Sequence, residues 1–206
     1  GSGTGKHAEE FARKRFSVNG VDLSPVMVKE ANQRKKDIFA NLLHFNVGDV
    51  RTYRVEKKFD AVISLFHVMS YQTQNEDIIA MFETAARHLK TGGVFIFDYW
   101  NGSGVLTNPP EIRIKRLENE KIEVLRIAEP EMHSNENVVY VNYSVQVKSK
   151  LTDGGGMTEL KEQHNMRYLF VPELMQFSQK YFDLNGTFSW MNKTAPNYSD
   201  WLAVSV

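Results

Sequence analysis

The sequence predicts a doubly wound α/β domain with an antiparallel β region inserted after its parallel strands. Residues 1–5 form a glycine-rich turn, which a helix, a strand and then an acid, Asp22, follow. Strand and helix patterns alternate along the first half, which is typical of a parallel sheet with right-handed crossovers. Over residues 111–170 apolar side chains recur at every second position, which indicates antiparallel strands.

The elements of the first half follow from local signals. Ser24 can cap a helix and Pro25 suits its first turn, where the missing N–H costs nothing. The continuous apolar run over 59–66 is expected of a strand covered on both faces. The glycines at 92–93 favour a helix end, because glycine tolerates a left-handed closing turn. We therefore expect a helix over 6–15, a strand over 16–21, a helix from 24–25, strands over 43–47 and 59–66, a helix over 76–89 and a strand over 94–98.

The second half changes character. Four antiparallel strands are expected around 112–114, 122–124, 139–147 and 166–170, with residues 153–156 as the loop between the last two, then a helix over 172–180 and strands over 182–190 and 201–206. Three units follow from this pattern. A core spans 1–110, an antiparallel lid or wall over the carboxyl edge of the sheet spans 111–170, and residues 171–206 complete the core sheet.

Composition narrows the class of protein. The 206 residues suffice for one domain, and 25 Lys plus Arg balance 25 Asp plus Glu, so no basic surplus points to nucleic acid or an anionic membrane. The absence of cysteine excludes disulfides, thiolate metal sites and cysteine nucleophiles, and it fits a cytoplasmic protein; we expect no metal. No apolar run is long enough to span a bilayer. A glycine turn of this kind needs a strand before it, so we expect a segment ahead of residue 1. That the first two residues are a tag remnant is disfavoured, because residues 3–5 continue the glycine pattern.

Three ligands could use the glycine loop. A P-loop for nucleoside triphosphates ends in Gly-Lys-Ser/Thr because the hydroxyl binds magnesium, and His7 stands there instead. The fingerprint for a nicotinamide dinucleotide needs a third glycine where Lys6 stands. The third candidate ligand is S-adenosylmethionine (SAM), whose ribose hydroxyls could donate hydrogen bonds to Asp22. Gly1 and Asp22 lie 21 positions apart, close to the roughly 20 expected for such an acid.

Several further motifs occur in a familiar order. The stretches at 1–5, 20–25, 48–50, 59–62 and 89–93 resemble, in sequence and spacing, those of class I SAM-dependent methyltransferases. The resemblance covers about the first half of the chain. It implies a Rossmann-like, mostly parallel sheet of seven strands with the last one antiparallel, and it implies that the first strand is missing from this chain.

The resemblance also assigns cofactor contacts. Asp22 would bind the ribose hydroxyls, Leu23 would pack on adenine, and Asp49 would accept a hydrogen bond from the adenine amino group. The cofactor is SAM, with S-adenosylhomocysteine as product. The full set of cofactor-binding residues that the resemblance implies is Gly1, Ser2, Gly3, Gly5, Asp22, Leu23, Asp49, Val50, Leu65 and Phe66.

The second half resembles nucleotide-linked amino-sugar N-methyltransferases, through its β insertion and its strand with Glu162, His164 and Tyr168. In those enzymes a histidine on the inserted strand acts as base, whereas the matching position here is Glu129. An amine or hydroxyl acceptor must lose a proton, and a nearby base can help. The candidate bases are Glu129, His133 and His164. The candidate substrate-binding residues are His67, Tyr99, Trp100, Arg113 and Tyr143.

The sequence thus predicts a methyltransferase that transfers a methyl group from SAM to a nitrogen or oxygen of a small molecule, with a sugar or nucleotide sugar preferred. Residues 64–67 read Ser-Leu-Phe-His and lack the Asn-Pro-Pro-Tyr-like motif of nucleic-acid base methylation. We expect neither nucleic-acid nor membrane partners, and monomer and homodimer both stay open. The alternatives are a non-catalytic SAM-binding regulatory module and an NAD-dependent oxidoreductase.

Overall fold

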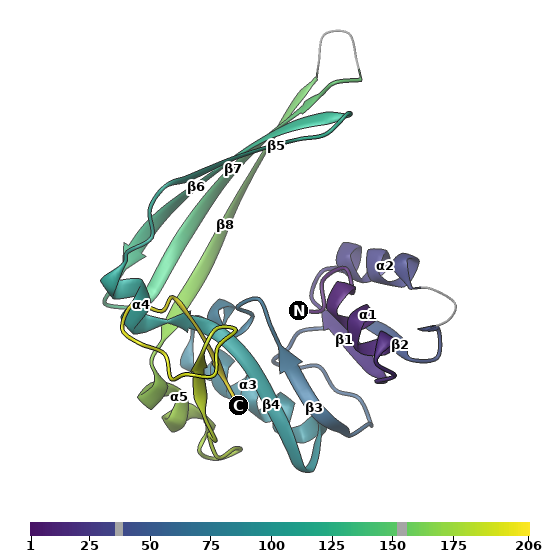
Figure 1. Cartoon of the computed structure of the whole chain (residues 1–206), viewed down its shortest axis with the longest axis vertical. Helices are drawn as coiled ribbons and strands as arrows, with labels where there is room; N and C mark the ends of the chain where they lie inside the picture. Colours follow the sequence, from purple (N-terminus) through teal and green to yellow (C-terminus); the bar gives the residue numbers. More distant parts are fainter. Residues whose placement is uncertain (36–38, 152–155) are drawn as a thin grey trace.

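The computed structural model describes residues 1–35, 39–151 and 156–206, which form an α/β core and a long β lobe that stands out from it (Figure 1). The helices are α1 (Lys6–Arg13), α2 (Pro25–Arg34), the 3-10 helix η2 (Met69–Tyr71), α3 (Asn75–His88), α4 (Gly102–Thr107) and α5 (Val171–Ser178). The strands are β1 (Val18–Asp22), β2 (Leu43–Val47), β3 (Phe59–Ser64), β4 (Leu89–Asn101), β5 (Arg113–Glu118), β6 (Ile122–His133), β7 (Val138–Ser149), β8 (Met157–Leu169), β9 (Thr187–Ser189) and β10 (Leu202–Ser205).

The first unit of the core is a parallel pair, in which β1 lies beside β2 with Asp22 opposite Val47. Helix α2 begins as predicted, because the Ser24 hydroxyl accepts a hydrogen bond from the Met27 N–H at 3.3 Å. The apolar side chains of α1, Ala8 and Ala12, pack against the start of β2. The carboxyl end of β1 is thereby fixed between the beginnings of α1 and α2.

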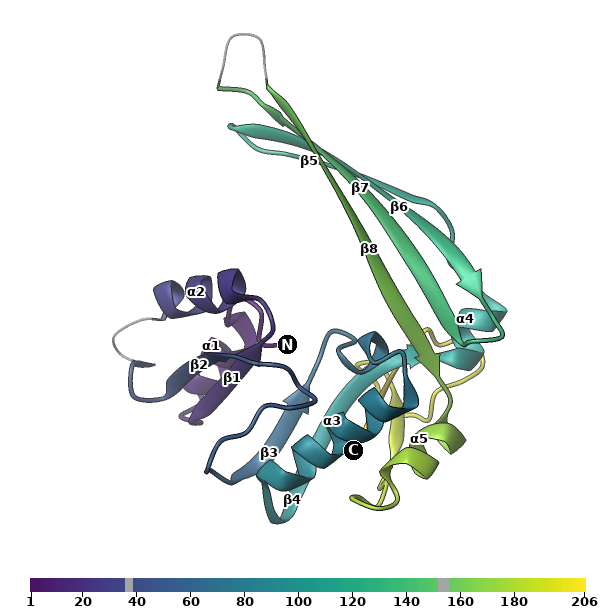
Figure 2. The same cartoon turned by 180° about the vertical axis from the view of Figure 1, so that it is seen from behind.

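The second unit is a larger mixed sheet around β4. Strand β3 runs parallel to β4, β10 runs antiparallel to it, and β9 follows β10. Strand β8 joins the same sheet at its end, with Tyr168 opposite Trp100 and Leu169 opposite Asn101. Helix α3 lies across β3 and β4, with α5 beside it (Figure 2). The aromatic core between them centres on Phe82, Phe95 and Phe97.

The predicted α/β class is confirmed, but the hydrogen bonds of the described residues do not join its strands into one parallel sheet. β1 and β2 form a separate pair, and no described strand bridges β1 and β3. Residues 91–93 also differ from the prediction. Helix α3 already ends at His88, because Leu89 is extended, and Gly92, with φ of 76°, lies inside β4 where its register with β3 shifts. The glycines therefore serve a strand irregularity rather than a helix end.

The lobe is a four-stranded antiparallel sheet of β5, β6, β7 and β8, as the alternating pattern predicts. Side chains alternate between the two faces of a strand, and directly paired residues share a face. One rung of one face holds Ala128, Tyr143 and Glu162, and the next holds Pro130, Val141 and His164. We call this the inner face, because its apolar part packs on Trp100 of the core. The outer face carries Glu129, Asn142 and Gln163. Of the predicted loop over 153–156, residues 153–155 lie outside the described residues.

Within the described ranges, no helix combines the length and the apolar character that crossing a bilayer requires.

Candidate active site

The glycine loop turns the chain into α1 through left-handed backbone. Gly3 has φ of 53° and Gly5 has φ of 78°, values that side-chain-bearing residues rarely adopt. A Cβ on Gly5 would stand 2.7 Å from the Phe45 ring, whereas a Cβ on Gly3 would meet nothing within 4 Å. The loop is therefore packed behind Gly5 and open at Gly3, where a ligand can approach the backbone.

Asp22 holds this loop from the end of β1. Its carboxylate accepts hydrogen bonds from the Gly3 N–H at 2.7 Å and from the Ser24 N–H at 2.9 Å. Each carboxylate oxygen has a second lone pair, so both ribose hydroxyls could still donate to Asp22. Next to it, 69% of Leu23 is exposed, which leaves an apolar surface for a flat ring.

Asp49, the predicted adenine contact, is bound to a neighbouring arginine. The Arg51 guanidinium donates to both Asp49 oxygens, with distances of 2.6 Å and 2.9 Å, and also pairs with Asp77 at 2.8 Å. The hydrogen bonds from Arg51 hold the pKa of the Asp49 carboxyl below its usual range. An adenine amino group would use a remaining lone pair of an oxygen that is already ordered.

The turn after β3 contains two successive non-glycine residues in left-handed backbone. Phe66 and His67 have φ of 64° and 63°. Asp98, which is fully buried in β4, accepts hydrogen bonds from the Phe66 N–H at 3.1 Å and the His67 N–H at 2.9 Å. Such backbone costs about 1–3 kcal/mol per residue and persists only where its surroundings enforce it. Asp98 is a site residue that our sequence reasoning missed; an acid at the end of the apolar run over 94–98 was the available signal.

The surroundings of the loop fit SAM. Ser2 Oγ in the loop and Ser64 Oγ at the end of β3 are buried without a hydrogen-bond partner among the described residues. Phe66 exposes 58% of its surface, with its ring 5.0 Å from that of His7 at the start of α1. Free polar atoms, an open glycine and exposed apolar side chains near the loop and the turn after β3 are features that a nucleoside with an amino-acid tail requires. Leu65 adjoins Phe66, and Val50, next to Asp49, packs partly buried against the core.

A second group of predicted residues gathers where the lobe meets the core. The Tyr71 hydroxyl lies 2.6 Å from His164 Nδ1, and His164 Nε2 lies 3.3 Å from Glu162 Oε2. The Tyr143 ring contacts His164 at 5.0 Å between centroids. On the core side the rings of His67 and Trp100 are 6.4 Å apart. Our sequence reasoning did not assign Tyr71 to the site.

Other predicted residues lie elsewhere. Glu129 and His133 project from the outer face of the lobe, because they alternate with the inner-face residues of β6. There His133 Nε2 lies 3.2 Å from a carboxylate oxygen of Glu131, and the centroid of its ring lies 4.2 Å from that of Tyr140. Tyr99 is fully buried in the core, because it alternates with Trp100 along β4. The structure thus brings only one of the three candidate bases, His164, to the junction.

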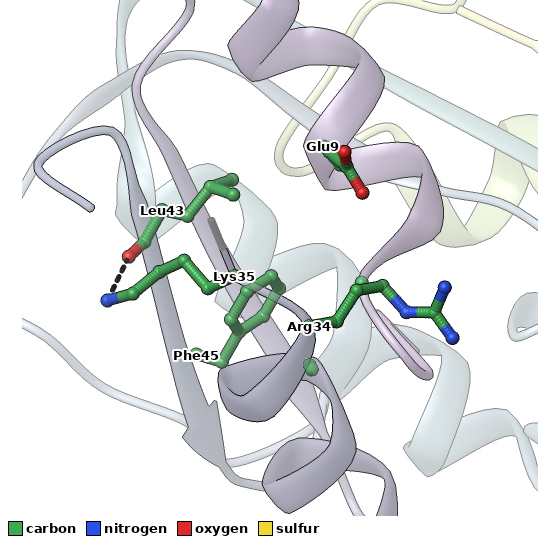
Figure 3. A pocket seen from close by; sticks show the side chains of 7 residues that line it. Glu9, Arg34, Lys35, Leu43 and Phe45 are labelled. Carbon is green, nitrogen blue, oxygen red and sulfur yellow. Dashed lines mark hydrogen bonds between the residues drawn. The ribbon is translucent and has the colours of Figure 1, made fainter. Parts of the chain in front are cut away.

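Two hollows accompany these groups. The larger, about 520 Å³, is lined only by lobe residues, among them Glu129 and Asn142 as well as Tyr143 and Glu162 of the junction group, so no residue of the cofactor side reaches it. The smaller lies behind the glycine loop, where Lys35 Nζ donates to the Leu43 carbonyl at 3.3 Å (Figure 3). It is too narrow for a water molecule. Neither hollow adds a chemical group to the junction of lobe and core.

The loop, the acid after β1 and the α/β core are the features expected of a SAM-binding domain of the methyltransferase class. Comparison with known proteins points the same way: residues 1–93 match the family described as "Methyltransferase domain". One relative, dTDP-3-amino-3,4,6-trideoxy-alpha-D-glucopyranose N,N-dimethyltransferase from Streptomyces venezuelae, is 36% identical over 98 residues, which are 48% of this chain and 39% of the relative. Another, dTDP-4-amino-2,3,4,6-tetradeoxy-D-glucose N,N-dimethyltransferase from Saccharopolyspora spinosa, is 30% identical over 98 residues, 48% of this chain and 37% of the relative. The match thus spans about two fifths of the length of these relatives.

Solved structures share the fold over the whole chain. A SAM-dependent methyltransferase from Clostridium acetobutylicum superposes with a TM-score of 0.80 at 20% identity, covering 99% of this chain and 79% of the other. A sugar N-methyltransferase from Streptoalloteichus superposes with a TM-score of 0.78 at 19% identity, covering 100% and 76%. The β lobe therefore belongs to the shared fold, together with the core.

Proposed function

We propose that this protein is a methyltransferase that transfers a methyl group from SAM to a nitrogen or oxygen atom of a small molecule, with a sugar or nucleotide sugar as acceptor. The observation that carries the proposal is Asp22. Its carboxylate orders the open glycine loop through Gly3 and retains lone pairs toward the space that a ribose would occupy. Two of the relatives that match about half of the chain are named for dimethylation of dTDP-linked amino sugars.

Methyl transfer from SAM requires little covalent chemistry from the protein itself. SAM supplies an activated methyl group when it is bound. The chain has to align an acceptor atom with that group, which the ordered turn over Phe66 and His67 and the neighbouring Trp100 can do. The acceptor also has to give up a proton, for which His164 is the candidate base at the junction.

The charges of the lobe support an anionic acceptor. Arg113, Lys115 and Arg126 all lie on the inner face, with Lys115 directly opposite Arg126 in the register of β5 and β6. None of the three forms an ion pair within the described residues, although Arg126 lies over the Tyr143 ring at 5.4 Å. Like charges opposite each other destabilise a sheet. A diphosphate would relieve this repulsion, which favours a nucleotide sugar over a neutral sugar.

A thermal-shift titration tests the cofactor. SAM and S-adenosylhomocysteine should each raise the melting temperature, while NADH should not; a ligand at 100 times its Kd adds about 2.7 kcal/mol of stability. Asp22→Asn and Asp22→Ala should abolish the shift. Asp183→Asn, an exposed carboxylate with no ion-pair partner in the described part of the chain, is the matched control.

The outcomes separate the alternatives. Stabilisation by NADH alone would establish an oxidoreductase and overturn the proposal, as would no stabilisation by either sulfur nucleoside. Where SAM binds, transfer of a labelled methyl group is measured with dTDP-linked amino sugars, free amino sugars and small amines and alcohols as acceptors. SAM binding without transfer to any of them would favour the regulatory module.

A further inference from the structure

Tyr71 carries a hydroxyl from the cofactor side to the lobe. It is the last residue of η2, which directly follows the turn over Phe66 and His67, and its N–H points at the carbonyls of His67 and Val68, each at 3.3 Å. The preceding residue, Ser70, is fully buried, and its hydroxyl accepts a hydrogen bond from the Trp100 N–H at 2.9 Å. The position of Tyr71 is therefore set by the same backbone that shapes the cofactor turn.

The partners of His164 determine the direction of its hydrogen bonds. An ionised Glu162 can only accept, so the contact at 3.3 Å requires a proton on His164 Nε2. In a neutral ring Nδ1 is then an acceptor, and the Tyr71 hydroxyl must donate to it across 2.6 Å. When the ring takes up a second proton, Nδ1 becomes a donor and the same Tyr71 oxygen becomes its acceptor. The two states differ by one proton with all three side chains in place.

We propose that Tyr71, His164 and Glu162 form a proton relay in which the Tyr71 hydroxyl receives the proton of the methyl acceptor and passes its own proton to His164 Nδ1. The relay rests on the proposed methyl transfer. Tyr71 is the residue that touches the acceptor, while His164 and Glu162 act through it. Tyr71 stays neutral before and after each transfer, because burial raises the pKa of its phenol above its ordinary value.

The proton and electron balance is simple. An ammonium acceptor loses one proton, Tyr71 gains it as its own proton moves to His164, and the resulting imidazolium faces the Glu162 carboxylate. The free electron pair of the amine then forms the N–CH3 bond as the S–CH3 bond breaks and its electrons stay on sulfur. The relay is restored when His164, whose side chain is 33% exposed, releases the proton to water.

Kinetics on the whole protein test the relay. Tyr71→Phe keeps the ring and removes only the hydroxyl; we expect kcat to fall about 100-fold, with the Kd of SAM and the KM of the acceptor within about twofold. His164→Ala should have a similar effect, and the double variant should be no slower than either single variant, because both remove one path. Tyr140→Phe removes a tyrosine hydroxyl from the outer face of the same lobe and should leave kcat unchanged. Unchanged kcat in Tyr71→Phe, or additive losses in the double variant, would overturn the relay.

Nitrogen-15 NMR of the imidazole gives a readout that needs no acceptor. When its imidazole ring is neutral, His164 should carry its proton on Nε2, and Tyr71→Phe should shift the Nδ1 resonance. A proton on Nδ1 instead would overturn the relay. The two proposals fail separately: lack of stabilisation by SAM refutes the methyltransferase, whereas methyl transfer by the wild type that is insensitive to Tyr71→Phe refutes only the relay.

Discussion

The cofactor side and the lobe place their functional groups by different means. On the cofactor side the chain itself forms the site: left-handed turns present backbone N–H groups, and two carboxylates, Asp22 and Asp98, hold them. In the lobe, regular strands carry the site on side chains, and residues distant in sequence meet through strand register. Pro130 and His164, for example, lie on one rung of the sheet although they are 34 positions apart. The first arrangement ties binding to folding stability, whereas the second lets acceptor contacts change with little effect on the fold.

The largest expected effect concerns Asp98. Asp98→Ala leaves the N–H groups of Phe66 and His67 without their acceptor and should cost about 3 kcal/mol of unfolding free energy, with SAM affinity lowered at least about tenfold. Asp98→Asn keeps one acceptor oxygen and should cost about 1 kcal/mol. Urea unfolding and SAM titration measure both quantities. A stable Asp98→Ala variant with normal SAM affinity would show that the turn does not depend on this carboxylate.

A smaller effect, confined to the acceptor, is expected in the lobe. The double change Lys115→Gln and Arg126→Gln should raise the KM of a nucleotide-linked acceptor about tenfold and leave the Kd of SAM unchanged. Its unfolding free energy should stay level or rise slightly, because two opposed like charges are removed. Lys148→Gln, on the outer face of β7, is the control and should alter neither quantity. Weaker SAM binding in the double variant would contradict the division between core and lobe.

The smallest effect is a pH dependence. Because Arg51 lowers the folded-state pKa of Asp49, the ionised carboxylate contributes stability above the ordinary carboxyl range near pH 4, and this contribution is lost as the pH falls through the lowered pKa. The stability difference between wild type and Asp49→Asn should therefore shrink between about pH 5 and pH 2. Urea unfolding across that range measures it, with Asp183→Asn as reference. A difference that stays constant with pH would exclude the Arg51 contact as its source.

Local signals predicted the core well. The caps and the glycine loop depend on neighbours within a few residues, so Ser24 and Gly5 were informative without a structure. The turn at Phe66 and His67 was not predictable, because its left-handed backbone depends on Asp98, 32 and 31 positions away. Gly92 shows the same limit, since a left-handed glycine can end a helix or serve a strand irregularity, and only the pairing with β3 decides which.

The lobe was predictable as a set of strands but not as a site. Whether a residue faces inward depends on its parity within the strand and on which neighbour it pairs with, so an error of one position reverses the face. Glu129 and His164 were equally plausible bases in sequence, yet the register of β6, β7 and β8 places them on opposite faces. The family match covers residues 1–93, so it gave no register for this region either.

Strand β8 makes the lobe a lever that pivots where the strand enters the core sheet. It runs unbroken from Met157 to its clamp in the core sheet, where Tyr168 pairs with Trp100. At about 3.3 Å per residue, Met157 lies about 36 Å from the clamp and His164 about 13 Å, so a rigid swing about the clamp moves His164 by about a third of the tip displacement. A tip displacement of about 3 Å directed along the Tyr71–His164 contact would stretch its 2.6 Å separation by about 1 Å and break it. The Tyr71–His164 contact therefore makes the junction of lobe and core sensitive to what binds or moves the far end of the lobe.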